Sequence, residues 1–346
     1  MNRVAVTGSA SGTASPADRG RPGHRTVRVG EFSFATAAIG NLRTPDGDLH
    51  AEQTVDAAWK SGIRHFDTSP HYGRGRSERR LGRALRGRPR DEYTLSTRAG
   101  CVLDPAPDAR GRDRADGLAG PAAYRRRRDF SAEGIRRSVE ESLNRLGLDR
   151  IDLVYLPDPD DRTDQAPDHA YPALERLRAE GVIGAIGLAV DRTEQPDHIL
   201  RDTDLDVLLL IGRYTLLDQR GLAGLLLLAA ERGVAVVVGG VFNSGLLAAP
   251  GPETAFDYAP AHLQLLEQEV ELRTVCERYG VPLRAAALRF PFGHPAVARA
   301  LVGTRSAREV RDAVAMLHCP VPDALWTELK ARRLLPAHVP TPKQAG

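Results

Sequence analysis

The sequence predicts an α/β protein whose parallel strands close into a (β/α)8 TIM barrel. Short runs rich in β-branched and aliphatic residues alternate with longer amphipathic stretches, and this alternation predicts a parallel sheet covered by helices. Eight such runs follow one another without a break, which favours a closed barrel over an open doubly wound sheet. The length of 346 residues suits either two average domains of about 150 residues or one barrel of this kind.

Each predicted element has its own local signal. Continuous or alternating apolar runs predict strands, and apolar residues spaced three or four apart predict helices. Trp326 lies on such a helical pattern and is expected to pack across the barrel. The predicted strands span 35–39, 63–67, 93–97, 151–156, 183–189, 206–211, 234–238 and 298–302, and the predicted helices span 51–60, 77–85, 132–146, 171–179, 220–231 and 262–279.

The chain divides into three parts. Residues 1–25 are rich in small and polar residues without periodicity, which predicts a disordered leader. Residues 26–335 form the single barrel, and residues 336–346 form a flexible tail. At the start of the barrel, valines and phenylalanines alternate on either side of Gly30, which predicts an N-terminal β-hairpin that could cover one end of the barrel.

Two connections are longer than usual. Residues 99–130 and 241–261 follow the third and seventh predicted strands, so both should overhang the barrel mouth, where the chemistry of such barrels takes place. The first connection contains four consecutive arginines, Arg125–Arg128. They either clamp an anionic ligand or form a solvated loop, and the sequence leaves both interpretations open.

Composition limits the class of partner. Lys and Arg total 48 and Asp and Glu total 45, and a formal charge of +3 spread along the chain argues against a nucleic acid or an anionic membrane. The expected partner is a small molecule, and no oligomeric state is predicted. The three cysteines are far apart, which implies neither a disulfide framework nor a zinc site. Without an export signal or a long apolar run, the protein is expected to be cytoplasmic.

The end of the second predicted strand carries candidate chemistry. Asp67 ends the strand and Tyr72 follows five residues later, so both can face one cavity. A tyrosine beside a cation can give a proton to a carbonyl oxygen or take one from an alcohol. The alternative is structural, with Asp67 bonded to loop amides and Tyr72 closing the core.

The stretch FDTSPHYGRGRSERRLGRAL around these two residues resembles the signature of the aldo-keto reductases. DEYTLSTRAG, LGLDRIDLVYLPDPD, RYTLLDQRG, VGGVFNSGLL and the C-terminal LVGTRSAREV follow in the order of that family. Within it, the sequence is most similar to the branch of D-threo-aldose (L-fucose) 1-dehydrogenases and pyridoxal 4-dehydrogenases. The resemblance implies a (β/α)8 barrel, a nicotinamide cofactor across its mouth and hydride transfer to or from a carbonyl carbon.

The catalytic tetrad of that family is only half present. Asp67 and Tyr72 match its aspartate and tyrosine, whereas Arg98 stands at the lysine and Pro157 at the histidine. Arg98 keeps a positive charge that can pair with Asp67, but it cannot relay a proton. Pro157 removes a hydrogen-bond donor, a loss of about 3–4 kcal/mol by analogy with an oxyanion-hole donor. His71 is the nearby replacement that the sequence offers.

The resemblance also implies cofactor-binding residues. Tyr214 matches the aromatic residue that stacks on the nicotinamide, although filling the core is its structural alternative. Asp191 stands where a carboxamide-binding Asn is usual, and Arg305 favours NADP over NAD. The remaining matches are Asn243, Ser244 and Gly245 for the pyrophosphate, and Gly303, Thr304 and Glu309 for the adenosine side.

These observations allow three functional interpretations. The first is an NADP(H)-dependent oxidoreductase acting on a sugar-like or small cyclic carbonyl or hemiacetal. The second keeps the barrel but replaces redox turnover by dehydration, epimerisation or cyclisation in a biosynthetic pathway, because the lysine and histidine are lost. The third is an inactive binding or regulatory subunit, for which the sequence shows no partner-binding feature.

Overall fold

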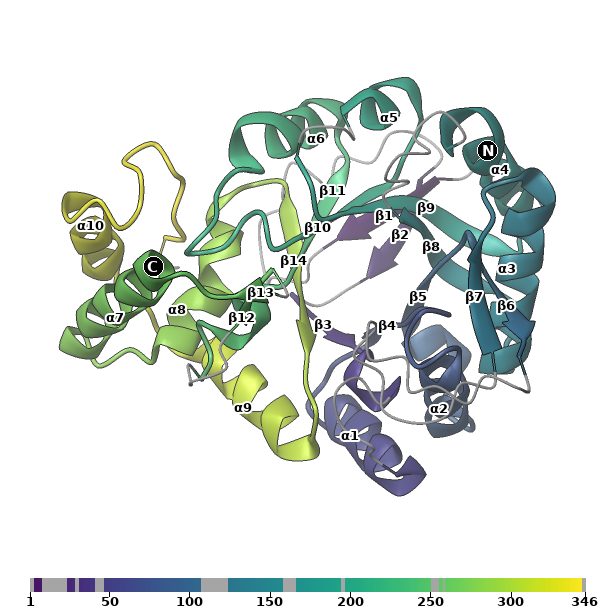
Figure 1. Cartoon of the computed structure of the whole chain (residues 1–346), viewed down its shortest axis with the longest axis horizontal. Coiled ribbons are helices and arrows are strands. Elements are labelled where there is room, and N and C mark those ends of the chain that lie inside the picture. The colour runs from purple at the N-terminus through teal and green to yellow at the C-terminus, as the bar shows by residue number, and fades with distance from the viewer. Residues whose placement is uncertain are drawn as a thin grey trace.

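Figure 1 shows the computed structural model, which describes residues 3–7, 24–28, 31–40, 47–106, 124–157, 166–193, 197–249, 255–257 and 259–343. Eight strands, all paired in parallel, close into a barrel, as the alternation of apolar runs predicts. In chain order these are β3 (Phe32–Ala35), β4 (His65–Asp67), β5 (Thr94–Arg98), β8 (Ile151–Pro157), β9 (Ile183–Val190), β10 (Val207–Ile211), β11 (Ala235–Gly239) and β14 (Val297–Gly303).

Helices surround the barrel (Figure 1), and α7 and α10 pack together at the edge that also holds the C-terminus. The predicted helix 220–231 begins as a π-helical turn at Leu222–Leu226 before α6, and α5 and α8 were not predicted. None of the described helices is both long and apolar enough to cross a bilayer. The helices are α1 (Asp48–Lys60), α2 (Arg76–Leu85), α3 (Ala132–Leu146), α4 (Tyr171–Ala179), α5 (Asp197–Asp202), α6 (Leu227–Arg232), α7 (Leu263–Arg278), α8 (Leu283–Arg289), α9 (Ala307–His318) and α10 (Asp323–Ala331).

The first barrel strand begins earlier than predicted. Residues 32–35 form β3, whereas the predicted strand 35–39 leaves the sheet and ends in a 3-10 turn, Ala38–Gly40. The turn is needed because Gly40 packs on the loop after β4, where a Cβ would lie 2.9 Å from the backbone of Tyr72. The chain must therefore bend out of the barrel wall to contact that loop.

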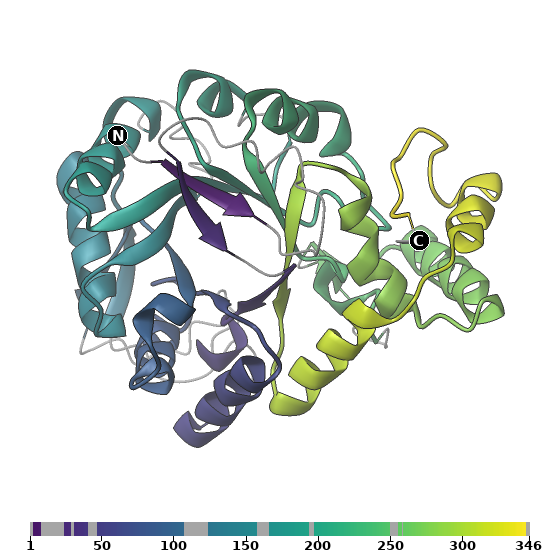
Figure 2. The same cartoon turned by 180° about the vertical axis from the view of Figure 1, so that it is seen from behind.

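The predicted N-terminal hairpin is wrong. β2 (His24–Arg28) pairs in parallel with β1 (Arg3–Thr7), and the phenylalanines expected in the hairpin lie in β3, between β14 and β4. Figures 1 and 2 place the β1–β2 pair across one end of the barrel, the end facing the viewer in Figure 2. Residues 3–7 and 24–25 of the expected disordered leader belong to these strands, whereas its other residues and Gly30 lie outside the described residues. The proposed domain boundaries stay predictions.

The barrel interior is apolar on one side and polar on the other. Leu153, Leu209 and Val237 contribute to an interior apolar cluster on β8, β10 and β11. Tyr155 joins this cluster and fills a notch at Gly187, where a Cβ would lie 2.5 Å from the tyrosine ring. The opposite wall, built from β4 and β5, supplies the polar side chains of the candidate site.

Both long connections contain elements that the sequence did not predict. In the first, β6 (Cys101–Pro105) and β7 (Tyr124–Arg128) form an antiparallel hairpin. The second contains a turn at Asn243–Gly245 and a short pair of strands, β12 (Ala255–Phe256) and β13 (Ala259–Pro260). The four arginines therefore lie on a strand, with alternate side chains on opposite faces.

Candidate active site

An ion pair at the ends of β4 and β5 forms the centre of the candidate site. Asp67 has no exposed surface, and its Oδ2 accepts a hydrogen bond of 2.8 Å from Nη1 of Arg98. The hydroxyl of Ser96 donates to Oδ1 at 2.6 Å, and the same Arg98 nitrogen donates to the carbonyl of Thr68 at 2.5 Å. The pair therefore fixes both side chains in one orientation.

Burial and ion pairing act in opposite directions on the pKa of each partner. Burial raises the pKa of the Asp67 carboxyl, while the charge of Arg98 and the Ser96 hydrogen bond oppose the rise. For Arg98, burial lowers the pKa, but the Asp67 carboxylate outweighs burial and the pKa is raised. Arg98 consequently remains a cation at any pH at which the protein would be assayed.

Tyr72 lies beside this cation. The Arg98 Cζ atom is 5.2 Å from the centroid of the Tyr72 ring, within the range of a cation–π contact. The loop that carries Tyr72 turns at Gly73, which has a φ of 63° and approaches the Gly40 carbonyl so closely that a Cβ would overlap it. Since Tyr72 is half-buried, its hydroxyl can meet a substrate while its ring is held in place.

A buried hydroxyl network supports the site, and sequence reasoning missed it. The Thr36 hydroxyl donates to the Asp67 carbonyl at 2.8 Å, and the Ser77 hydroxyl donates to the Thr36 carbonyl at 2.8 Å. Ser96 and these two residues tie β3, β4, β5 and the start of α2 together. Two signals were available: Ser96 is an interior residue two positions before Arg98, and Ser77 lies within the quoted signature.

Pro157 leaves one side of the mouth without a side-chain donor. It is the last residue of β8 and pairs with Ala189 of β9, so it occupies the expected strand end. Tyr155, two residues earlier, faces the interior, but it is fully buried and its hydroxyl has no hydrogen-bond partner within the described part of the chain. The described residues of this strand therefore offer the substrate no replacement for the missing histidine.

His71 contacts the arginine hairpin rather than taking over that role. Nη1 of Arg126 donates to the His71 ring, 2.8 Å from Nδ1. His71 is an exposed residue, but partial loss of hydration of its ring, followed by the positive charges of Arg126 and Arg98, lowers the pKa of His71 to about 4. The ring is therefore neutral at pH 7 and accepts a hydrogen bond. Arg127, on the other face of β7, pairs with Asp104 and Asp129, so that arginine has a structural role.

We expect His71 to make stability depend on pH between about 6.5 and 4. The unfolded state takes up the proton near the ordinary pKa of 6.5 and the folded state only near 4. Stability is therefore present above pH 6.5 and lost as the pH falls through this window. Chemical denaturation at several pH values should show a smaller loss for His71→Gln than for the wild type. His338→Gln, an exposed histidine, is the control and should behave as the wild type.

The turn after β11 has the features of an anion-binding loop. Asn243 and Ser244 have positive φ angles of 46° and 58°. Asn243 is 4% exposed, and neither its amide oxygen nor its amide nitrogen has a partner within the described residues. A Cβ at Gly245 would meet nothing within 4 Å, so a ligand can approach the backbone there.

The motif after β14 opens α9. Ser306 caps this 12-residue helix by accepting a hydrogen bond from the Glu309 amide, and a helix N-terminus favours anions. Thr304 is buried, with a hydroxyl that lacks a partner among the described residues, and Gly303 borders open space. The Arg305 guanidinium is 67% exposed and pairs with Glu309 at 2.7 Å. These residues fit an adenosine phosphate, with Glu309 holding Arg305 in position.

Tyr214 and Asp191, the residues expected beside the nicotinamide, have different surroundings. Tyr214 has no exposed surface and packs against Phe290 and His294, with ring centroids 5.1 and 6.0 Å away. This packing supports the core-filling alternative rather than stacking on a nicotinamide. Asp191 follows β9 with an exposed side chain, and its carbonyl accepts a hydrogen bond of 2.5 Å from Arg213. Its role toward a carboxamide stays a prediction.

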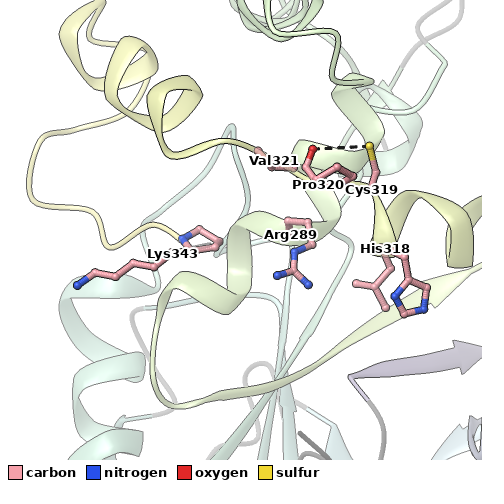
Figure 3. Close-up of a pocket in the computed structure, with 8 residues that line it drawn as sticks. Arg289, His318, Cys319, Pro320, Val321 and Lys343 are labelled. Carbon is pink, nitrogen blue, oxygen red and sulfur yellow. Dashed lines mark hydrogen bonds between the residues drawn. The ribbon is translucent and has the colours of Figure 1, made fainter. Parts of the chain in front are cut away.

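A separate cavity of about 300 Å³ lies at the C-terminal edge of the molecule. Figure 3 shows that the side chains of Arg289, His318 and Lys343 point in different directions, so their charges do not converge on one point. The lining of this cavity contains none of the residues expected in the candidate site. Its lining consists of Arg289, Leu317, His318, Cys319, Pro320, Val321, Pro342 and Lys343.

Comparison with known proteins agrees with this geometry. The chain is 40% identical over 315 residues to D-threo-aldose 1-dehydrogenase from a Pseudomonas species, covering 90% of this chain and 96% of the relative. It is 39% identical over 334 residues to pyridoxal 4-dehydrogenase from Microbacterium luteolum, with the same coverage. Among solved structures, the glycerol dehydrogenase of Gluconobacter oxydans superimposes with a TM-score of 0.72 at 25% identity, over 92% of this chain and 95% of that one.

The holo form of an aldo-keto reductase from Bacillus halodurans superimposes with a TM-score of 0.70 at 26% identity, over 90% of this chain and 94% of that one. The profile of the aldo/keto reductase family matches residues 33–333, which include all of the barrel strands except Phe32, the first residue of β3, and the turns after β11 and β14. By this match and by its 40% identity to a relative that it covers almost completely, the chain belongs to the aldo/keto reductase family of oxidoreductases.

Proposed function

We propose that the protein is an NADP(H)-dependent oxidoreductase that acts on a sugar-like or small cyclic carbonyl or hemiacetal. The observation that carries the proposal is the Asp67–Arg98 ion pair of 2.8 Å lying 5.2 Å from the Tyr72 ring. The D-threo-aldose 1-dehydrogenase and pyridoxal 4-dehydrogenase relatives support the class of substrate. Both names describe the dehydrogenation of a polar compound that carries an aldehyde group.

Tyr72 is the acid or base of this mechanism. In oxidation its phenolate takes the proton of the substrate hydroxyl, and in reduction its hydroxyl returns that proton to the carbonyl oxygen. A nearby positive charge favours the phenolate, and Arg98 supplies that charge without giving up a proton itself. Asp67 acts through Arg98, because its carboxylate keeps the guanidinium beneath the tyrosine ring.

The nicotinamide cofactor, when bound, accepts or supplies the hydride. Asn243, Ser244 and Gly245 would hold its pyrophosphate through the turn after β11, and Gly303, Thr304 and Arg305 would hold its adenosine phosphate at the start of α9. The orphaned polar atoms of Asn243 and Thr304 are consistent with this assignment, because buried polar groups ordinarily have partners.

Pro157 restricts the chemistry of the substrate. A carbonyl that needs two hydrogen-bond donors loses one of them here, at a cost of about 3–4 kcal/mol in the transition state if nothing compensates. A cyclic hemiacetal carries a more acidic hydroxyl than a simple alcohol, so oxidation of a hemiacetal depends less on a second donor. We therefore infer that oxidation at the anomeric carbon is favoured over reduction of an open-chain ketone.

A titration of the protein with NADPH and NADH, followed by protein fluorescence, tests the proposal. Saturable NADPH binding, followed by turnover of at least one member of a panel of aldoses, pyridoxal-type aldehydes and cyclic ketones, supports it. Absence of binding at millimolar cofactor would overturn it and favour the non-redox alternative. Pro157 is the observation that favours this alternative, which is a dehydration, epimerisation or cyclisation. It stands in place of the histidine that the redox reaction of the family ordinarily uses.

Arg305→Gln should separate the two nicotinamide cofactors. A hydrogen bond to a charged group contributes about 1.5–3 kcal/mol, so we expect NADPH to bind about tenfold to a hundredfold more weakly while NADH binding is unchanged. The measurement is the dissociation constant of each cofactor by fluorescence titration. Arg308→Gln, which changes an exposed arginine at the second position of α9, is the matched control. Equal weakening of both cofactors would argue that Arg305 does not contact a 2′-phosphate.

A further inference from the structure

Arg299 carries a buried positive charge inside the barrel. It lies on β14, is 2% exposed, and is the strand neighbour of Val237, an interior residue of β11. Within the described part of the chain, its Nε and Nη2 atoms have no hydrogen-bond partner and no carboxylate pairs with it. Burial lowers the pKa of Arg299 to about 9, so the guanidinium is still charged at neutral pH.

The ionisable neighbours of Arg299 provide no negative charge. Burial, and then the charge of Arg299 itself, lowers the pKa of His65 well below its ordinary value, so this ring is neutral. Burial raises the pKa of Tyr155, so this residue keeps its proton, and its hydroxyl has no partner among the described residues. The Asp67 carboxylate is already engaged by Arg98.

An uncompensated charge of this kind is costly, and proteins ordinarily pair a buried charge or bring an ion to it. The surrounding interior residues, Leu209, Val237 and Leu301, are apolar. What the interior lacks is a group that accepts hydrogen bonds from N–H and O–H donors and carries one negative charge. A cation satisfies neither the charge nor the donors, and a neutral sugar accepts hydrogen bonds without compensating the charge.

We propose that the barrel interior binds a small inorganic anion such as chloride, held by the guanidinium of Arg299 with the Tyr155 hydroxyl as a further donor. This site is distinct from the proposed cofactor-binding turns. Arg299 precedes Gly303 by four residues on β14, so it lies deeper in the barrel than the strand end. The site is also distinct from the catalytic ion pair, although Tyr155 connects the two, with its ring centroid 5.8 Å from the Arg98 Cζ atom.

The test uses the full-length protein without cofactor. The melting temperature is measured at constant ionic strength while chloride replaces gluconate, a much larger anion. We expect the wild type to gain stability with chloride and then to saturate, because a ligand that binds the folded state stabilises it. Arg299→Met should lose this dependence and Arg299→Lys should keep it. Arg289→Met, which removes a 31% exposed arginine, is the matched control and should keep it too.

Crystals grown in bromide give a direct readout that needs no variant. An anomalous peak within hydrogen-bonding distance of Nε or Nη2 of Arg299 is the expected result. Water alone at this place, a wild type insensitive to chloride, or an unchanged chloride dependence in Arg299→Met would each overturn the inference. Since neither measurement involves substrate, its failure would leave the proposed oxidoreductase function untouched.

Discussion

Tyr72→Phe is expected to lower kcat by about 10²–10⁴, the usual contribution of a positioned acid or base. The substitution removes one oxygen atom and keeps the ring beside Arg98, so folding and cofactor binding should change little. Steady-state oxidation of the best substrate from the panel gives kcat, and NADPH titration of the same variant gives the dissociation constant. A fall in kcat with unchanged cofactor affinity assigns Tyr72 to proton transfer.

Tyr279→Phe is the matched control for this experiment. Tyr279 follows the end of α7, far from the site, and its hydroxyl forms a hydrogen bond of 3.0 Å with Glu328. The variant should therefore keep full activity. If Tyr72→Phe also kept full activity, Tyr72 would have no part in proton transfer. The arrangement of Arg98 beside its ring would then have to serve substrate binding instead.

The sequence predicted the barrel and the centre of the site because both depend on local patterns. Continuous apolar runs such as that of β10 can be buried only in a parallel sheet, and Asp67 and Arg98 end neighbouring strands, so their side chains meet at one edge. The first strand was misplaced because its extent depends on a distant contact. Gly40 contacts the backbone of Tyr72, and no local sequence pattern indicates this contact.

The contacts of Tyr214 and His71 also depend on residues that are distant in the sequence. In the sequence, an aromatic residue after a strand is equally consistent with stacking on a ligand and with filling the core. The packing of Tyr214 against Phe290 and His294, which supports the core, is visible only in the structure. His71 was a candidate donor from its position in the sequence. Its contact with Arg126 comes from a hairpin whose strand β7 is rich in arginine, a composition that does not predict a strand.

Asp67→Asn should reduce both stability and activity strongly. The substitution leaves the Arg98 guanidinium, whose side chain is 11% exposed, without a carboxylate, and removing one partner of a buried ion pair costs about 3–5 kcal/mol. We expect urea denaturation to show a loss of that size in the free energy of unfolding. Asp312→Asn is the control, because its pair with Arg284 is exposed on both sides and such pairs contribute about 0–1 kcal/mol.

A double variant separates the structural role of this pair from its catalytic role. Replacing both partners, as Asp67→Asn with Arg98→Met, removes the uncompensated charge, so stability should recover toward the wild type. Activity should stay low, because the cation that favours the Tyr72 phenolate is gone. If activity returned together with stability, the pair would only maintain the fold. If stability did not return, the Ser96 and Thr68 hydrogen bonds would carry the larger share of the free energy lost.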